Sequence, residues 1–100
     1  MYDVYVKQSE LETLSIEREQ ELARRFYEED DLEAARLLIT ANLKFVLYIA
    51  HSYSGYKLPF QDIVQEGNVG LMKAVKAFDP NKNIRLSTFA VKWIRSEIVN

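Results

Sequence analysis

The chain has 100 residues, 48% of them hydrophobic, and it contains no cysteine. This length and composition fit one domain with a real core, and they exclude a disordered chain, a disulfide framework and a cysteine metal cluster. No apolar run approaches the roughly 20 residues that a membrane-spanning helix requires, and the N-terminus lacks the basic and apolar parts of a signal peptide. The absence of cysteine fits a reducing, intracellular environment.

The net charge of −2 hides an uneven distribution along the sequence. Residues 1–35 carry 11 acids and 4 bases, whereas residues 36–100 carry 4 acids and 9 bases. Within residues 73–95 a single acid, Asp79, stands among six bases: Lys73, Lys76, Lys82, Arg85, Lys92 and Arg95. Such a stretch is either a solvated basic face or a surface that contacts phosphates, and charge alone does not separate the two.

Every element that the sequence predicts is a helix, because residues of high helix propensity dominate and strand-like alternation is absent. A short helix is expected over residues 2–11. The next helix is expected to follow Ser15, a good N-cap residue, and to run to about Glu28. Its first turns hold acids that suit the positive end of the helix dipole: Glu17, Glu19 and Glu21.

A long helix is expected to follow an N-cap at Asp30, which forms a capping-box-like pair with Glu33. This helix runs to about Tyr53 and stops before Gly55. Helical spacing places its apolar residues in one arc, and Asn42 falls in the middle of that arc. The Asn42 amide either bonds to a neighbouring backbone group or faces a ligand through a gap in the apolar surface.

The following helix is expected to open at Pro59 and to end near Ala77. Gly67 lies within its core arc, and we expect another helix to approach closely there, because an internal glycine costs about 1 kcal/mol relative to alanine. The opposite face carries Val69 and Met72 among polar residues: Gln61, Asp62, Gln65, Asn68 and Lys76. These two apolar side chains are either exposed by chance or part of a protein-binding patch.

The last helix is expected to start near Ser87, after a loop over residues 78–83, and to be still in progress at Asn100. We therefore expect the chain to be a fragment of a longer protein. Phe89 and Trp93 lie four residues apart, on the shoulder of the helix between its core side and its polar side. They are either boundary aromatics with exposed rims or a platform on which unstacked nucleobases stack, with bases nearby for the phosphates.

Three stretches resemble successive segments of region 2 of bacterial sigma-70 family factors, the subunits that give RNA polymerase its promoter specificity. They are "LITANLKFVLYIAHSY", "LPFQDIVQEGNVGLMKAVKAFDP" and "RLSTFAVKWIRSEI". The preceding "LSIEREQELARRFYEEDDLEAAR" resembles the helical region that leads into region 2. Within the family the sequence is most similar to the heat-shock branch, because Leu86 and Lys92 stand where primary factors usually have aromatics.

The resemblance implies an all-α fold, a compact bundle of about four to five helices. Residues 1–30 would form an N-terminal helical lead-in packed on the same domain, and residues 31–100 the region 2 core. It implies a promoter-recognition protein of the bacterial cytoplasm and nucleoid, without enzymatic activity, cofactor, metal site or membrane association. An anti-sigma factor or a chaperone is a possible regulator. The alternative is a helical interaction module that binds a regulator rather than DNA.

The resemblance also assigns two binding surfaces. The first would dock on the coiled coil of the β′ clamp of core RNA polymerase. Its residues are Gln61, Asp62, Gln65, Glu66, Asn68 and Met72. The second would bind the nontemplate strand of the promoter −10 element.

Within the second surface, Phe89 matches the aromatic that stacks on the first flipped adenine, and Trp93 matches a tryptophan at the upstream edge of the bubble. Ser87 and Thr88 match residues of the pocket around flipped bases. Asn42 and Phe45 match residues that help hold a second flipped base, with Arg85 and Ser87 nearby. The face that meets the last paired step upstream matches Arg95, Ser96 and Val99. Lys92 departs from the pattern, because it places a cation where an aromatic wedge is usual.

Overall fold

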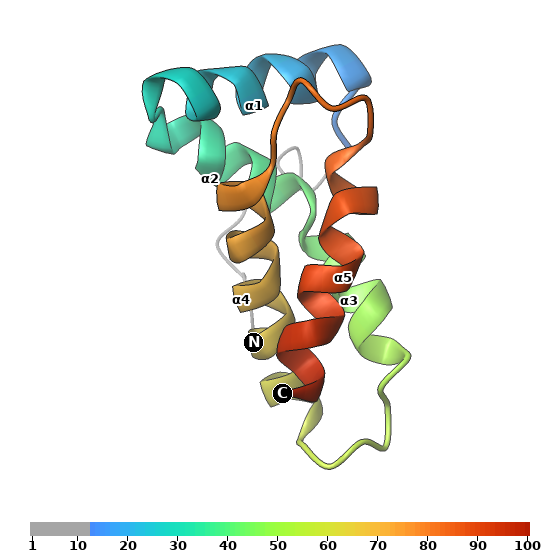
Figure 1. The fold of residues 1–100 in the computed structure, drawn as a ribbon. Helices are drawn as coiled ribbons and strands as arrows, with labels where there is room; N and C mark the ends of the chain where they lie inside the picture. The colour runs from blue at the N-terminus through green and yellow to red at the C-terminus, as the bar shows by residue number, and fades with distance from the viewer. Residues whose placement is uncertain (1–12) are drawn as a thin grey trace.

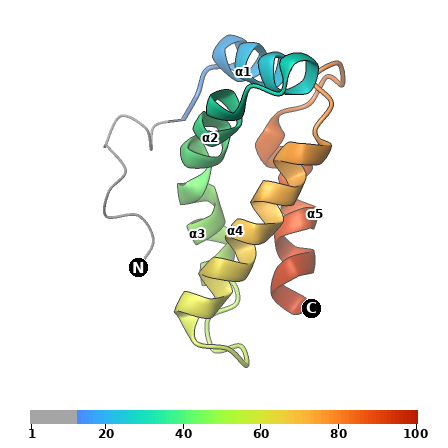
Figure 2. The same ribbon diagram turned by 90° about the vertical axis from the view of Figure 1, so that its left-hand side faces the viewer.

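The computed structural model describes residues 13–100, in which every regular element is an α-helix. The helices are α1 (Ile16–Glu29), α2 (Leu32–Ala41), α3 (Leu43–His51), α4 (Phe60–Ala77) and α5 (Leu86–Val99). The all-α prediction is confirmed, whereas the helix expected over residues 2–11 lies outside the described residues. Figures 1 and 2 show α4 and α5 side by side, with α2 and α3 following one another along them and α1 lying across one end.

The N-cap of α2 lies one residue later than the sequence predicts. Ser15 caps α1 as expected, because its hydroxyl accepts the Arg18 N–H at 3.0 Å. Asp30 does not cap α2; it ends α1 in a left-handed conformation (φ 53°) and donates its N–H to the Phe26 carbonyl. Asp31 is the N-cap of α2, and its carboxylate accepts the N–H groups of Glu33 and Ala34 at 3.1 and 3.2 Å.

The Asp31 carboxylate also receives Nε and Nη2 of Arg25 at 3.0 and 2.8 Å. The hydrogen bond from the Ala34 N–H, followed by that from Arg25, lowers the pKa of Asp31 below its ordinary value. A lowered pKa in the folded state means that ionised Asp31 stabilises the fold above its ordinary pKa, and that this contribution is lost as the pH falls through the lowered pKa.

Asp31→Asn is therefore expected to lower the melting temperature at neutral pH, and the difference from the unmodified chain should shrink as the pH falls below about 4. Thermal unfolding followed by circular dichroism across this pH range measures it. Asp30→Asn is the matched control, because asparagine tolerates the left-handed conformation and position 30 carries no cap of α2. A difference that stays constant at all pH values would contradict the stabilising role of the ionised Asp31 carboxylate.

The prediction of a single helix over residues 31–54 is wrong, because the helix is interrupted at Asn42 and forms two helices, α2 and α3. The Asn42 side chain donates from Nδ2 to the Leu38 carbonyl at 2.8 Å, and its backbone leaves the helical region (φ −110°, ψ 9°). Asparagine side chains compete in this way with the backbone bonds of a helix. The apolar arc survives the break, since Leu38 and Val46 on its two sides are both fully buried.

The remaining boundaries differ from prediction by two residues at most: α3 ends at His51, two residues before the expected Tyr53, and α4 ends at Ala77 as expected. Gly55 turns the chain after α3 with φ 86°, a conformation that favours glycine. Pro59 is the N-cap of α4 rather than its first residue, and α5 begins at Leu86. Leu86 is fully buried, which anchors the start of α5 in the core. None of the described helices is both long enough and apolar enough to cross a membrane.

Helices α4 and α5 approach each other closely at Gly70. A Cβ at Gly70 would stand 2.5 Å from the Trp93 carbonyl oxygen and 2.7 Å from the Ile94 Cα. The close approach expected at Gly67 is confirmed, since a Cβ there would stand 2.8 Å from Cγ1 of Val46 in α3. Because the absence of a side chain at Gly70 sets how near α5 lies to α4, it also fixes the position of the Trp93 backbone.

Candidate nucleic-acid interface

Three aromatic side chains form a row: Phe78 at the end of α4, and Phe89 and Trp93 in the first half of α5. The Phe89 ring lies 5.5 Å from the Phe78 ring and 6.1 Å from the Trp93 ring, centroid to centroid. Phe78 is buried (4% exposed), Phe89 is half-buried and Trp93 is 36% exposed. The row therefore runs from the core to the surface, so that Phe78 supports Phe89 from behind while Trp93 keeps an open edge.

A hollow of about 540 Å³ lies along the outer side of α5. It brings together five of the predicted DNA-binding residues, and it adds Ile84 from the preceding loop. Its lining residues are Ile84, Thr88, Phe89, Lys92, Trp93 and Ser96. The lining combines an aromatic surface with one cation and three hydroxyl or indole groups, a combination that suits a base and its adjoining phosphate.

A second hollow adjoins Phe89 beneath the loop between α4 and α5, and the sequence analysis did not predict it. It is lined by Ala77, Phe78, Asp79, Lys82, Asn83, Ile84 and Phe89. The Asp79 side chain accepts the Asn81 N–H at 2.9 Å, which gives this loop a defined turn. The sequence predicts a loop for these polar residues and assigns them no site. Their position shortly before Phe89 along the chain is the only local signal for this hollow.

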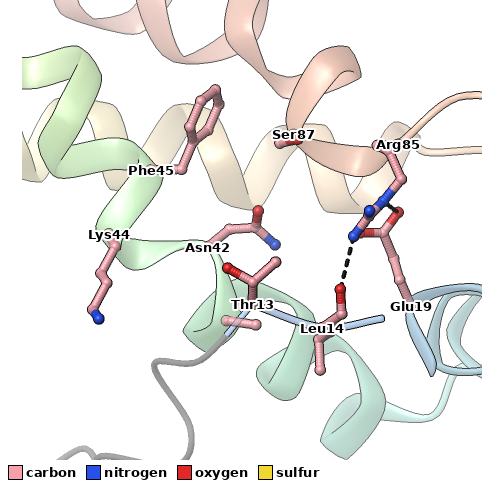
Figure 3. Close-up of a pocket in the computed structure, with 9 residues that line it drawn as sticks. Thr13, Leu14, Glu19, Asn42, Lys44, Phe45, Arg85 and Ser87 are labelled. Carbon is pink, nitrogen blue, oxygen red and sulfur yellow. Dashed lines mark hydrogen bonds and ion pairs between the residues drawn. The ribbon is translucent and has the colours of Figure 1, made fainter. Parts of the chain in front are cut away.

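A third, smaller pocket of about 150 Å³ lies at the first turn of α5 (Figure 3). It unites four residues that the resemblance places around a second flipped base: Asn42, Phe45, Arg85 and Ser87. The break at Asn42 positions two of them, because it lets the chain turn between α2 and α3 beside the start of α5. Lys44 also lines the pocket, but its side chain points away from the others in Figure 3.

Glu19 of α1 also lines this pocket, and the sequence did not predict it as a site residue. It is 3% exposed, and its carboxylate accepts the Leu86 backbone N–H at 2.9 Å. It also forms an ion pair with Arg85, whose Nη2 lies 3.3 Å from Oε1. The position could have been recognised from spacing, since Glu19 shares one helix face with Leu22, Ala23 and Phe26.

The other predicted DNA-binding residues lie apart from the three hollows. Arg95 and Val99 are exposed on α5, and neither lines a hollow described above. Of the six bases in residues 73–95, two form ion pairs: Arg85 with Glu19, and Lys73 with Glu97 at 2.6 Å. The basic stretch is therefore less available to phosphates than its sequence indicates.

The predicted polymerase-binding residues follow one another along α4. Gln61, Asp62, Gln65, Glu66 and Met72 are exposed, and Met72 leaves 45% of its surface uncovered. Asn68 is half-buried, and its Oδ1 is buried without a hydrogen-bond partner within residues 13–100. An exposed methionine among polar side chains fits a contact surface, because water is a poor environment for its apolar side chain.

The geometry defines an all-helical domain whose last helix presents aromatic and basic side chains beside three hollows. Comparison with known proteins then identifies the family. A model of sigma-70 region 2 matches residues 38–100, and the chain belongs to this family. Sigma factors are not enzymes, in agreement with the sequence-based expectation.

One relative is the RNA polymerase sigma-C factor of Myxococcus xanthus. The two sequences are 53% identical over 83 residues, which is 83% of this chain and 28% of the relative. The chain thus spans less than a third of the length of that relative. The similarity to the heat-shock branch stays a prediction, as do the assigned roles of the individual site residues.

Proposed function

We propose that this domain binds core RNA polymerase, and that it recognises and opens the promoter −10 element when transcription starts. The observation that carries the proposal is the arrangement at α5: an aromatic row in which Phe89 lines two hollows, and a separate pocket lined by Asn42 and Ser87. The hollows at Phe89 and the separate pocket would each suit one unstacked base of the same strand. The domain acts without making or breaking a covalent bond.

The energetics of base flipping link recognition to opening. Extruding a base from a duplex costs a few kcal/mol and is easiest at A·T-rich steps. Stacking on an aromatic side chain returns roughly 1–3 kcal/mol per base. A base that stacks on Phe89 and also fits the hollow beneath the loop therefore offsets the cost of its extrusion, whereas a base that fits poorly does not. Sequence recognition and strand opening thus become one event.

The exposed face of α4 completes the proposal. Its Gln65 and Met72 would contact the coiled coil of the polymerase clamp. Because α4, which carries this face, packs on the DNA-reading helix α5 through the buried Gly70, polymerase and promoter would bind the same pair of helices. Such a factor would act in the bacterial cytoplasm, on the nucleoid.

A fluorescence titration tests the proposed function. Trp93 is the only tryptophan of the chain, so its emission reports directly from the proposed interface. A nontemplate-strand oligonucleotide with a −10 sequence should change this emission at lower concentration than a scrambled strand of equal length. If neither strand has a sequence-dependent effect, even with a β′ coiled-coil fragment present, the interaction-module alternative is favoured instead.

Lys92→Trp tests one of the two departures from the family pattern, the lysine that lines the hollow along the outer side of α5. Lysine attracts phosphates, whereas an indole ring inserts against an exposed base step and helps to unstack it. Because Lys92 lacks this wedge, the unmodified domain should open only promoters whose −10 sequence matches well. The variant is expected to raise opening at imperfect promoters several-fold, measured by permanganate reactivity of the promoter with reconstituted polymerase. Lys92→Gln, which removes only the charge, should not produce this gain. Equal opening by Lys92→Trp and the unmodified domain would refute the expectation.

A further inference from the structure

We infer that Glu19 determines the specificity of the pocket at the start of α5: by binding Arg85 it keeps this pocket from acting as a phosphate site and reserves it for a neutral base. The inference rests on the proposed function, because it concerns the pocket in which a second flipped base would lie. Through Glu19, helix α1 would take a direct part in determining which DNA sequence the domain binds.

The first observation is how completely Glu19 engages Arg85. Arg85 Nε lies 3.4 Å from both carboxylate oxygens of Glu19, and Nη2 lies 3.3 Å from Oε1. The same Nη2 donates to the Leu14 carbonyl at 2.9 Å. Figure 3 shows the guanidinium lying against Glu19 and Leu14, at the edge of the pocket that also holds Asn42 and Ser87. These bonds hold the guanidinium in one orientation.

The second observation is that Glu19 is bound to the backbone as well. Arg85 occupies the N-cap position of α5 but makes no side-chain cap bond, so the first N–H groups of the helix need another acceptor. The Glu19 carboxylate supplies one at the Leu86 N–H. A carboxylate beside the positive end of a helix dipole is favourably placed. Glu19 is therefore fixed from two sides and cannot swing away from Arg85 without leaving that N–H unpaired.

Charge then explains the effect on ligand choice. An arginine guanidinium is a preferred ligand of phosphate, and on a basic face it would attract any strand regardless of sequence. With a buried carboxylate about 3 Å from it, the guanidinium offers little net positive charge, and a phosphate entering the pocket would also meet the negative charge of Glu19. A neutral base meets no such repulsion. It finds the Asn42 amide oxygen, the Ser87 hydroxyl and the Phe45 ring among the lining groups.

Glu19→Gln separates the charge from the cap. Glutamine keeps a side-chain oxygen that can accept the Leu86 N–H, but it no longer neutralises Arg85. The variant should bind a scrambled single strand several-fold more tightly at low salt. The slope of log affinity against log salt should steepen by about 0.7, the value for one further phosphate contact on a single strand. The ratio of affinities for the −10 strand and the scrambled strand should fall.

Two matched variants control this experiment. Glu21→Gln makes the same change of net charge on the exposed surface of α1, and it should leave the scrambled-strand slope within error of the unmodified chain. The double variant Glu19→Gln/Arg85→Gln removes both charges and leaves no unpaired buried ion. It should restore the unmodified slope. Trp93 fluorescence reports binding, and thermal unfolding shows that each variant is folded.

Several outcomes would overturn the inference. One is a Glu19→Gln slope equal to that of Glu21→Gln, and another is a steeper slope that persists in the double variant. A slope of the double variant shallower than that of the unmodified chain would show that Arg85 already contacts phosphate, and this comparison holds even if the single variant fails to fold. Failure of the proposed function looks different, because the unmodified chain would then show no preference for the −10 strand at any salt concentration.

Discussion

Gly70→Ala is expected to destabilise the domain by about 2 kcal/mol or more, which lowers the melting temperature by roughly 8–16 °C for a domain of this size. The new methyl group would stand 2.5 Å from the Trp93 carbonyl oxygen and 2.7 Å from the Ile94 Cα. Both are backbone atoms, so no side-chain rotation relieves the overlap and α5 must move away from α4. The gain of about 1 kcal/mol in helix propensity offsets only part of this cost.

Gly67→Ala is the matched comparison in the same helix. Its methyl group would meet the Val46 side chain at 2.8 Å and the Ile94 and Ile98 side chains at ordinary distances. Because the close contact is with a side chain rather than the backbone, we expect a smaller loss than for Gly70→Ala. Chemical unfolding monitored by circular dichroism gives both values. The packing described for α4 and α5 would be wrong if Gly70→Ala were as stable as the unmodified domain.

Phe89→Ala is expected to lower affinity for the −10 strand by roughly 5- to 150-fold, the equivalent of 1–3 kcal/mol for one stacked base. Affinity for a scrambled strand should change far less, because that binding depends mainly on phosphate contacts. Phe89 lies between Phe78 and Trp93 and forms a wall of two hollows, so its loss removes the stacking surface and opens the two hollows into one another. The titration with both strands measures the ratio.

Phe60→Ala serves as the control for this change. Phe60 is a partly exposed phenylalanine at the start of α4, where it stacks on His51 at 4.8 Å and lines none of the three hollows. The same side-chain deletion there should leave strand affinity unaltered. An equal loss for both strands on Phe89→Ala, together with a larger loss of stability than Phe60→Ala shows, would argue that Phe89 supports the fold rather than a base.

The helices could be predicted from the sequence because their signals are local. The Ser15 cap, the turn at Gly55 and the periodic apolar residues each act within a few positions along the chain. The break at Asn42 is also local, but its signal is weak: an asparagine side chain bonds to the backbone in helices and in turns alike. The pattern favoured a continuous helix because the apolar arc continues on both sides of the break.

The candidate site depends on contacts that no local pattern contains. Glu19 and Leu86 are separated by 67 positions, and only the placement of α1 across the end of the bundle brings them together. The acid was interpreted as a charge that favours the start of its own helix, whereas it is buried and caps another helix. The hollow beneath the loop at Asp79 and Asn83 was missed for the same reason, because its other wall is Phe89.

The family resemblance supplied what spacing alone left open, namely which of two interpretations to expect for Phe89, Trp93 and Asn42. The structure then modifies each of them. Phe89 packs against the buried Phe78 and also lines two hollows. Asn42 bonds to a backbone carbonyl through its nitrogen and lines a pocket as well. Structural and ligand-binding roles are therefore combined in the same side chains.

A structure of this chain bound to the nontemplate strand of a −10 element would test the proposed function most directly. We predict one extruded base stacked on Phe89 and a second base in the pocket of Asn42, Phe45 and Ser87, with Glu19 still paired to Arg85. A strand bound along another face, or one held only by its phosphates with its bases turned to solvent, would contradict the account.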